Sequence, residues 1–356
     1  MKLKFNPLLA GAAGVFTVLY VFVAVLPLPR EIQFEPEWTI DASQTPEFSE
    51  SENCIPFKTG QLAGYFSENG KILNARSFAV KAAVSEFYFA PYGLSDDSVE
   101  IFSPDGSFAC RIDSSGFPFI DENRIFMFLP GGSSFARYSS QGKKLWAYEG
   151  FVPVTAFSSA DCGTVAGFAD GKVLLFDESG NLRQEFVPGG SKYSVILGAD
   201  LSPDGNYLAC ISGLEKQRIV LAKREKEHIV ITFYKYMEKD QTRQALVKFS
   251  RDGDWFYYAF AGGLGIVNCV DGRCTELKMD GWVSSLMETD IPGTFFVLTR
   301  EKSRDKFVNR VYFVENYMGL SGSFDFTSRS AFIYAKGSDL FVGRDSRISK
   351  IKLRMN

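Results

Sequence analysis

Histidine is almost absent from this chain of 356 residues, which contains only His228. A metal site built from several histidines is therefore excluded, and a histidine-based catalytic triad is not expected. None of the six cysteines belongs to a C-x-x-C pair, so zinc-ribbon and thioredoxin-like chemistry finds no support. The sequence accordingly predicts no metal site, no cofactor site and no catalytic residues.

Helical patterning is also missing from most of the chain. No segment of 57–356 keeps a helical period over about ten residues, which argues against an α/β architecture. Phe and Gly are abundant instead, with 34 and 32 residues, and they favour strands and tight turns. This composition predicts an all-β domain. The formal net charge of −3 gives no reason to expect nucleic acid as a partner.

The longest apolar run lies near the N-terminus, where Leu8 to Leu26 contain no charge. As a helix this run extends roughly 28 Å, close to the thickness of a bilayer core. Two lysines precede it and acidic residues follow it, so the positive-inside rule places the N-terminus in the cytoplasm. We predict a cytoplasmic stretch 1–7, a transmembrane signal anchor over 8–28 and a periplasmic remainder. A cleaved signal peptide is the alternative.

Basic residues are missing from the stretch that follows. Residues 31–56 contain seven Asp and Glu but no Lys or Arg, and Ser, Thr and Pro fill much of the rest. Low hydrophobicity with charge of one sign disfavours a packed core. We therefore predict an acidic stalk or linker over 29–56, in which Trp38 and Ile40 are compatible with one short strand against the main domain.

A repeat runs through the predicted domain at 57–356. Its unit is an apolar strand, a polar turn with glycine and a second apolar strand. The clearest turn glycines are 36, 36 and 38 residues apart: Gly70, Gly106, Gly142 and Gly180. A second class of hairpin lies between them, and we count seven hairpins of each class. Four short strands in each period are typical of a β-propeller blade.

The hairpin count predicts how the ring closes. The series begins with the Gly70 hairpin and ends with a hairpin of the other class at Gly337. We therefore expect the last blade to combine C-terminal inner strands with the N-terminal Gly70 hairpin, which removes two open sheet edges. Arg347 to Leu353 can add one more strand to that blade. The prediction is seven four-stranded blades, with eight as the alternative.

The turn sequences resemble known propeller repeats. The stretch Leu201 to Ala209, which reads LSPDGNYLA, is similar to the WD-like repeats of TolB-type bacterial propellers, and Phe102 to Gly106 carries the same core letters. Gly171 to Asp177, which reads GKVLLFD, resembles quinoprotein-like propeller repeats. This resemblance implies a propeller architecture over residues 57 to 353. It does not fix an activity, because these repeats occur in propellers of many functions.

Two groups of residues are candidate sites. The first is a basic C-terminus that can bind anionic lipid headgroups or an acidic partner, or that only protects an edge strand: Arg344, Arg347, Lys350, Lys352 and Arg354. The second is a disulfide between Cys269 and Cys274, which flank a four-residue loop. Two free thiols on neighbouring strands are the alternative.

The function expected from these features is binding. Rigid propellers present variable loops, and loops concentrate binding residues. We predict a membrane-anchored scaffold that binds a protein partner of the cell envelope, without enzymatic activity. The alternatives are a propeller enzyme, either a quinone-cofactor dehydrogenase or a glycosidase-like protein, and a structural subunit of a large membrane complex.

Overall fold

The computed structural model describes residues 7–24, 32–46, 53–79, 81–226, 228–317 and 319–355. Helix α1 (Pro7–Ala24) has 18 residues. In these ranges no helix has both the length and the apolar character needed to cross a membrane. The predicted anchor over 8–28 and the single-pass membrane localisation are therefore wrong. The periplasmic placement depended on that anchor.

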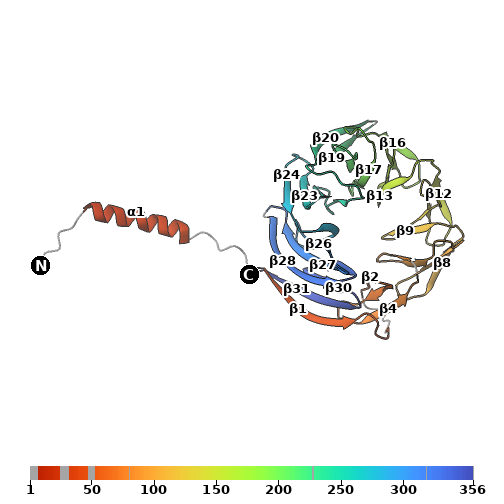
Figure 1. The fold of residues 1–356 in the computed structure, drawn as a ribbon, viewed down its shortest axis with the longest axis horizontal. Coiled ribbons are helices and arrows are strands. Elements are labelled where there is room, and N and C mark those ends of the chain that lie inside the picture. Colours follow the sequence, from red (N-terminus) through yellow and green to blue (C-terminus); the bar gives the residue numbers. More distant parts are fainter. Residues whose placement is uncertain are drawn as a thin grey trace.

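The predicted stretch 1–7 lies outside the described residues except for Pro7, and so do residues 47–52 of the predicted stalk. The described residues from Ile32 onward form strands, turns and loops, without a helix. Eight antiparallel sheets surround a central opening, and we number them as blades I to VIII in chain order (Figure 1). The prediction of a β-propeller is confirmed, but seven blades is the wrong number and the alternative of eight is observed.

The first four blades are built as follows. Blade I contains β2 (Ile55–Thr59), β3 (Leu62–Phe66) and β4 (Ile72–Ser77). Blade II contains β5 (Lys81–Val84), β6 (Phe89–Tyr92), β7 (Val99–Phe102) and β8 (Phe108–Ile112). Blade III contains β9 (Phe117–Asp121), β10 (Arg124–Phe128), β11 (Phe135–Tyr138) and β12 (Lys144–Tyr148). Blade IV contains β13 (Val154–Ala160), β14 (Gly163–Phe168), β15 (Val173–Phe176) and β16 (Leu182–Phe186).

The other four blades continue the ring. Blade V contains β17 (Ile196–Leu201), β18 (Tyr207–Ser212), β19 (Arg218–Glu225) and β20 (His228–Tyr236). Blade VI contains β21 (Val247–Phe249), β22 (Trp255–Phe260), β23 (Gly263–Asn268) and β24 (Cys274–Lys278). Blade VII contains β25 (Trp282–Glu288), β26 (Thr294–Ser303), β27 (Lys306–Glu315) and β28 (Gly319–Ser328). Blade VIII contains β29 (Ala331–Lys336), β30 (Asp339–Arg344), β31 (Arg347–Met355) and β1 (Ile32–Asp41).

The repeated glycines have a packing reason as well as a backbone reason. Gly142 and Gly180 have φ of 74° and 81°, which side chains rarely tolerate. A Cβ at Gly142 would lie 2.4 Å from the carbonyl oxygen of Arg111, and one at Gly180 would lie 2.4 Å from the Trp146 ring. Each turn therefore packs directly on the outer strand of the preceding blade, which explains the regular spacing in the sequence.

Strand β1 closes the ring. It pairs antiparallel with β31, from Ile32 opposite Met355 to Asp41 opposite Arg347, and completes blade VIII. An N-terminal outer strand thus closes the last blade as expected, but the strand lies in the segment predicted as a stalk. The Gly70 hairpin, β3 and β4, belongs to blade I instead.

The segment predicted as an acidic stalk contains a paired strand, because the acidic side chains of β1 have basic partners that are far away in the sequence. Glu37 lies 2.8 Å from Lys350, and Glu35 lies 2.8 Å from Arg354, both across the pairing with β31. The other face of β1 is apolar, and the Trp38 ring lies 5.9 Å from that of Phe341. A short stretch of sequence around β1 therefore looks like an unstructured linker, because the residues that neutralise its charges lie at the other end of the chain.

The core lies between neighbouring blades. One cluster joins blades IV and V through Val165, Val173, Leu208 and Val220, and similar clusters fill the other junctions. Each sheet therefore buries both faces against its neighbours, which accounts for near-continuous apolar strands such as β15 and β18. This packing fixes the inner strands around the central opening.

Candidate binding face at the mouth of the channel

The two faces of the ring carry different connections. In the four-stranded blades the chain enters each inner strand from the same side, so the links between blades and the middle turns lie on one face. We call this the entry face. The turns that close the inner and outer hairpins lie on the opposite face, the turn face. Loops of the two faces therefore form two independent surfaces around one channel.

An apolar hollow opens at the entry face. Its volume is about 440 Å³, and β9, β13, β17 and residues 244–247 line it. Phe117 stacks on Phe128 with ring centroids 4.9 Å apart, and it remains 43% exposed. Phe157 contacts Phe128 edge to face at 4.9 Å, which holds the aromatic wall rigid. The hollow is thus a preformed apolar site contributed by several blades.

The connection between β20 and β21 borders further hollows. Residues 237–239 line one of about 620 Å³, and residues 239–243 line a second of about 620 Å³. Residues 244–247 reach the apolar hollow. Arg243 lies over the Trp282 ring at 4.7 Å in the middle of this path. A single connection therefore borders three hollows in turn, the last of which is the apolar hollow.

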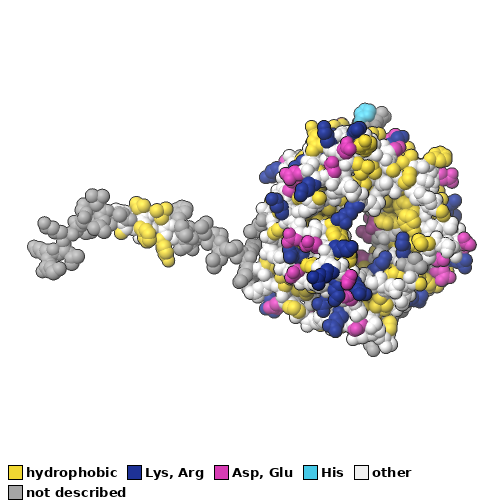
Figure 2. Space-filling view, in the orientation of Figure 1, with side chains coloured by type: hydrophobic (Ala, Val, Ile, Leu, Met, Phe, Trp, Pro, Cys, Tyr) yellow, Lys and Arg dark blue, Asp and Glu magenta, His cyan; other side chains and the backbone are white. Residues whose placement is uncertain are grey.

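Exposed apolar side chains lie on the neighbouring loops. Phe151 is fully exposed between β12 and β13, and Tyr193 and Leu214 are exposed on loops of blades IV and V. The Leu214 N–H donates to the Tyr193 carbonyl oxygen at 3.1 Å, which holds these two loops together. In Figure 2 hydrophobic side chains gather beside the central opening on the side of β9 and β13. Grouped exposed apolar side chains are typical of interaction surfaces.

A half-buried carboxyl joins three inner strands. Asp200 of β17 accepts a hydrogen bond from the Ser158 hydroxyl of β13 and one from the Phe249 N–H of β21 at 2.7 Å. Burial raises the pKa of Asp200 to about 6, against these hydrogen bonds and the nearby Lys248, which lower it. Asp200 therefore holds blades IV, V and VI together at the channel wall.

We expect this carboxyl to make the fold pH-sensitive. The pKa of Asp200 is about 6 in the folded chain, above the ordinary value near 3.9. The folded state therefore binds the proton more tightly, and stability rises as pH falls through 6. Relative to Asp200→Asn, the natural chain should gain about 1 kcal/mol between pH 7 and pH 5. Urea unfolding at both pH values measures this, and parallel profiles of the two proteins would contradict it.

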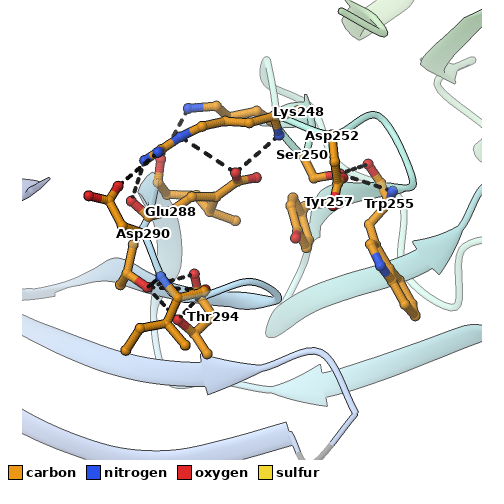
Figure 3. Close-up of polar contacts among 12 residues, drawn as sticks. Lys248, Ser250, Asp252, Trp255, Tyr257, Glu288, Asp290 and Thr294 are labelled. Carbon is orange, nitrogen blue, oxygen red and sulfur yellow. Dashed lines mark hydrogen bonds and ion pairs between the residues drawn. The ribbon is translucent and has the colours of Figure 1, made fainter. Parts of the chain in front are cut away.

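The turn face has a polar hollow of about 240 Å³ between blades VI and VII (Figure 3). Arg251 bridges the two turns: its guanidinium donates to the Glu288 carbonyl oxygen at 2.8 Å and lies 3.1 Å from Asp290. Burial raises the pKa of Glu288, although the Arg251 N–H and Lys248 lower it. These contacts join the turns of blades VI and VII, while Glu288 Oε1 and Asn316 Nδ2, which border the same hollow, have no hydrogen-bond partner among the described residues.

The predicted basic patch is not a free surface. Lys350 lies 2.8 Å from Glu37 and 3.0 Å from Asp339, and Lys352 and Arg354 pair with Glu37 and Glu35. Arg347 stands at the start of β31 opposite Asp41 of β1, and Arg344 ends β30. Lys350, Lys352 and Arg354 therefore join the two closing strands, and β31 lies between β1 and β30 and is not the edge strand that the sequence suggested.

The two candidate cysteines are not opposed. Cys274 pairs with Val267, while Cys269 lies in the turn, where Asn268 N–H donates to the Arg273 carbonyl oxygen at 2.9 Å. Both thiols are free, and burial raises the pKa of Cys269 to about 12. A thiol with such a pKa is weakly reactive. A cross-strand cysteine pair requires Cys269 opposite Cys274, but the observed register places Val267, two residues earlier, at that position.

No group of three or more His, Cys, Asp or Glu that could hold a metal ion occurs in the ranges that the structure describes. The aromatic hollow is not among the sites that the sequence predicts. The only available signal was the density of Phe between Phe117 and Phe128, and Phe in alternating strands equally predicts a blade core. Its role depends on which blades face the channel.

Comparison with known proteins agrees with this architecture. A family model described as β-propeller protein matches residues 1–356. A protein of Treponema pallidum (strain Nichols), described as uncharacterized, is 31% identical over 306 residues, 83% of this chain and 81% of that protein. BamB from Moraxella catarrhalis resembles 90% of this chain over its whole length, with a TM-score of 0.57 and 12% identity, a likeness of fold alone. The chain therefore belongs to the β-propeller proteins.

Proposed function

We propose that this propeller is a protein-binding module without enzymatic activity, and that it binds a polypeptide segment of its partner at the channel mouth on the entry face. The observation that carries the proposal is the run of three hollows along residues 237–247, which ends at the apolar hollow. An elongated site of this kind suits an extended chain better than a compact small molecule.

The surroundings of the hollow support this proposal. Phe117, Phe151, Tyr193 and Leu214 are exposed on the same face, and aromatic side chains contribute much of the affinity at protein interfaces. The aromatic wall is held by ring contacts at 4.9 Å, so a partner side chain would enter a preformed site. Preformed sites lose little conformational freedom on binding, which favours affinity.

Photocrosslinking in the cells that make the protein tests the proposal. A photoreactive phenylalanine analogue in place of Tyr193 should yield one discrete adduct with a partner protein. Val230 on the outer strand β20 is similarly exposed and provides the matched control position. Phe117→Ser should reduce the Tyr193 adduct by about tenfold, because it opens the aromatic wall. The same adducts from both positions, or an adduct unaffected by Phe117→Ser, would exclude this face as the binding site.

A further inference from the structure

Basic side chains follow the channel mouth on the side away from the aromatic hollow. The inner strands of blades II, VI and VIII begin at the entry face next to Lys81, Arg243 and Arg329. Arg300, at the entry-face end of β26, and Lys58, near the end of β2, lie between these positions. We call these five residues the basic arc. Figure 2 shows Lys and Arg side chains bordering the central opening opposite its hydrophobic side.

Contacts connect one half of the arc across blades VI, VII and VIII. Arg243 lies over the Trp282 ring at 4.7 Å, and Trp282 contacts Phe307 at 5.6 Å. Arg300 lies over the other side of this aromatic pair, 4.4 Å from the Phe307 ring centroid, and donates to the Arg329 carbonyl oxygen at 2.8 Å. Arg243, Arg300 and Arg329 are therefore held next to one another.

The other half of the arc continues into blades I and II. The Gly60 N–H donates to the Ser330 hydroxyl at 2.8 Å, which joins blade I to the residue after Arg329. Lys58 donates to the Ala82 carbonyl oxygen at 2.5 Å and approaches Lys81. Burial lowers the pKa of Lys58, and the positive charge of Lys81 lowers it further. The fold therefore brings like charges together along the mouth.

The charges of the arc are not neutralised within the described part of the chain. None of the five residues forms an ion pair with a described carboxylate, whereas Arg124, Arg251 and three basic residues of β31, Lys350, Lys352 and Arg354, do. Lys81, Arg243 and Arg329 are exposed, and so is most of Lys58, whose amine is partly shielded from water where it meets Ala82. Maintaining unpaired like charges in one place costs free energy, which an anionic partner would offset.

We propose that the partner segment is an acidic polypeptide that places a large apolar side chain in the aromatic hollow and its carboxylates on the basic arc. This rests on the protein-binding function proposed above and names the chemistry of the partner. The arc and the hollow share one channel mouth, so a single extended segment can meet both. Carboxylates suit this site because Arg binds them through paired hydrogen bonds while Lys attracts them as a point charge.

A fluorescent peptide with a central Phe-Phe pair flanked by glutamates tests the proposal with the full chain. Fluorescence anisotropy should detect binding that weakens as salt is raised. The double substitution Arg243→Glu/Arg329→Glu should weaken it at least about tenfold. Lys143→Glu/Lys144→Glu is the matched control, because it changes the net charge by the same amount. These two residues lie at the start of β12 and in the turn before it, on the turn face, so this variant should bind the peptide like the natural chain. Thermal unfolding verifies that both variants fold.

Peptide variants and other anions separate the remaining outcomes. Replacing the glutamates by lysines should abolish binding, and replacing the Phe pair by serines should weaken it. An equal loss of peptide binding in both double variants would mean that only the net charge of the protein matters, and it would overturn the proposal. Tighter arc-dependent binding of single-stranded DNA or phosphatidylglycerol vesicles would also overturn it. If the Tyr193 adduct forms to the same extent in the Arg243→Glu/Arg329→Glu variant, the proposed acidic character of the partner is wrong while the protein-binding function stands.

Discussion

Deletion of residues 32–41 is expected to lower the free energy of unfolding by about 4 kcal/mol or more. The deletion removes β1, so β31 becomes an unpaired edge along its whole length. It also removes Phe34, Trp38 and Ile40, which pack on the clusters at the two junctions of blade VIII. Partial burial of each apolar side chain contributes on the order of 1–2 kcal/mol, and β31 loses its cover as well. Urea unfolding of the full chain and the deletion variant measures the difference.

A charge variant separates strand pairing from electrostatics. Glu35→Gln/Glu37→Gln keeps the strand but removes its ion pairs with Arg354, Lys350 and Lys352. Exposed ion pairs contribute about 1 kcal/mol or less, so this variant should remain close to the natural chain. If the deletion also remained within about 1 kcal/mol of the natural chain, β1 would be a dispensable linker and the ring would not depend on it.

Replacement of Arg124 by Met is expected to cost about 2 kcal/mol. Arg124 is only 5% exposed, and its guanidinium lies 2.6 Å from Asp161 and 3.3 Å from Asp121. Its Nε also donates to the Ser159 hydroxyl at 3.0 Å, which links blades III and IV. Met retains most of the apolar stem but leaves Asp121 and Ser159 without their shared partner. Arg124 is buried, whereas Asp121 and Asp161 are 34% and 92% exposed, so the cost comes from the lost hydrogen bonds of a buried guanidinium and exceeds that of an exposed pair.

Arg111→Met is the matched control for this substitution. Arg111 lies 2.9 Å from Asp113, but both side chains are more than half exposed. The change should cost less than about 1 kcal/mol. Equal stability losses in the two variants, measured by thermal and urea unfolding, would mean that the Arg124 network does not fix the junction of blades III and IV.

Local sequence patterns predicted the blade architecture because propeller hairpins are local structures. Gly142 and Gly180 mark turns in which backbone angle and packing both require glycine, and their spacing reports the length of a blade. The blade number was harder to predict, since the outer pair of blade VIII is not a hairpin. Strands β1 and β31 come from opposite ends of the chain, and no turn residue marks their meeting.

The candidate sites show the same division. The basic C-terminus was visible in the sequence, but its partners Glu35 and Glu37 lie more than 300 residues away. The cysteine pair is predicted by counting loop residues, but the observed register differs by two residues and places Cys274 opposite Val267. The aromatic hollow combines β9, β13 and β17 of three blades with residues 244–247 of a fourth, so no single segment carries its signal.

The sequence by itself determined that this chain is a β-propeller, because strand period, turn glycines and hairpin spacing are properties of neighbouring residues. Only the tertiary structure decided the number of blades, the closing role of β1, and which loops meet at the channel mouth. These depend on contacts such as Glu37 with Lys350 and Arg300 with Arg329, between residues that come together only when the ring is complete. Circular closure is a long-range property, and a local pattern holds no information about which distant strand completes the last sheet.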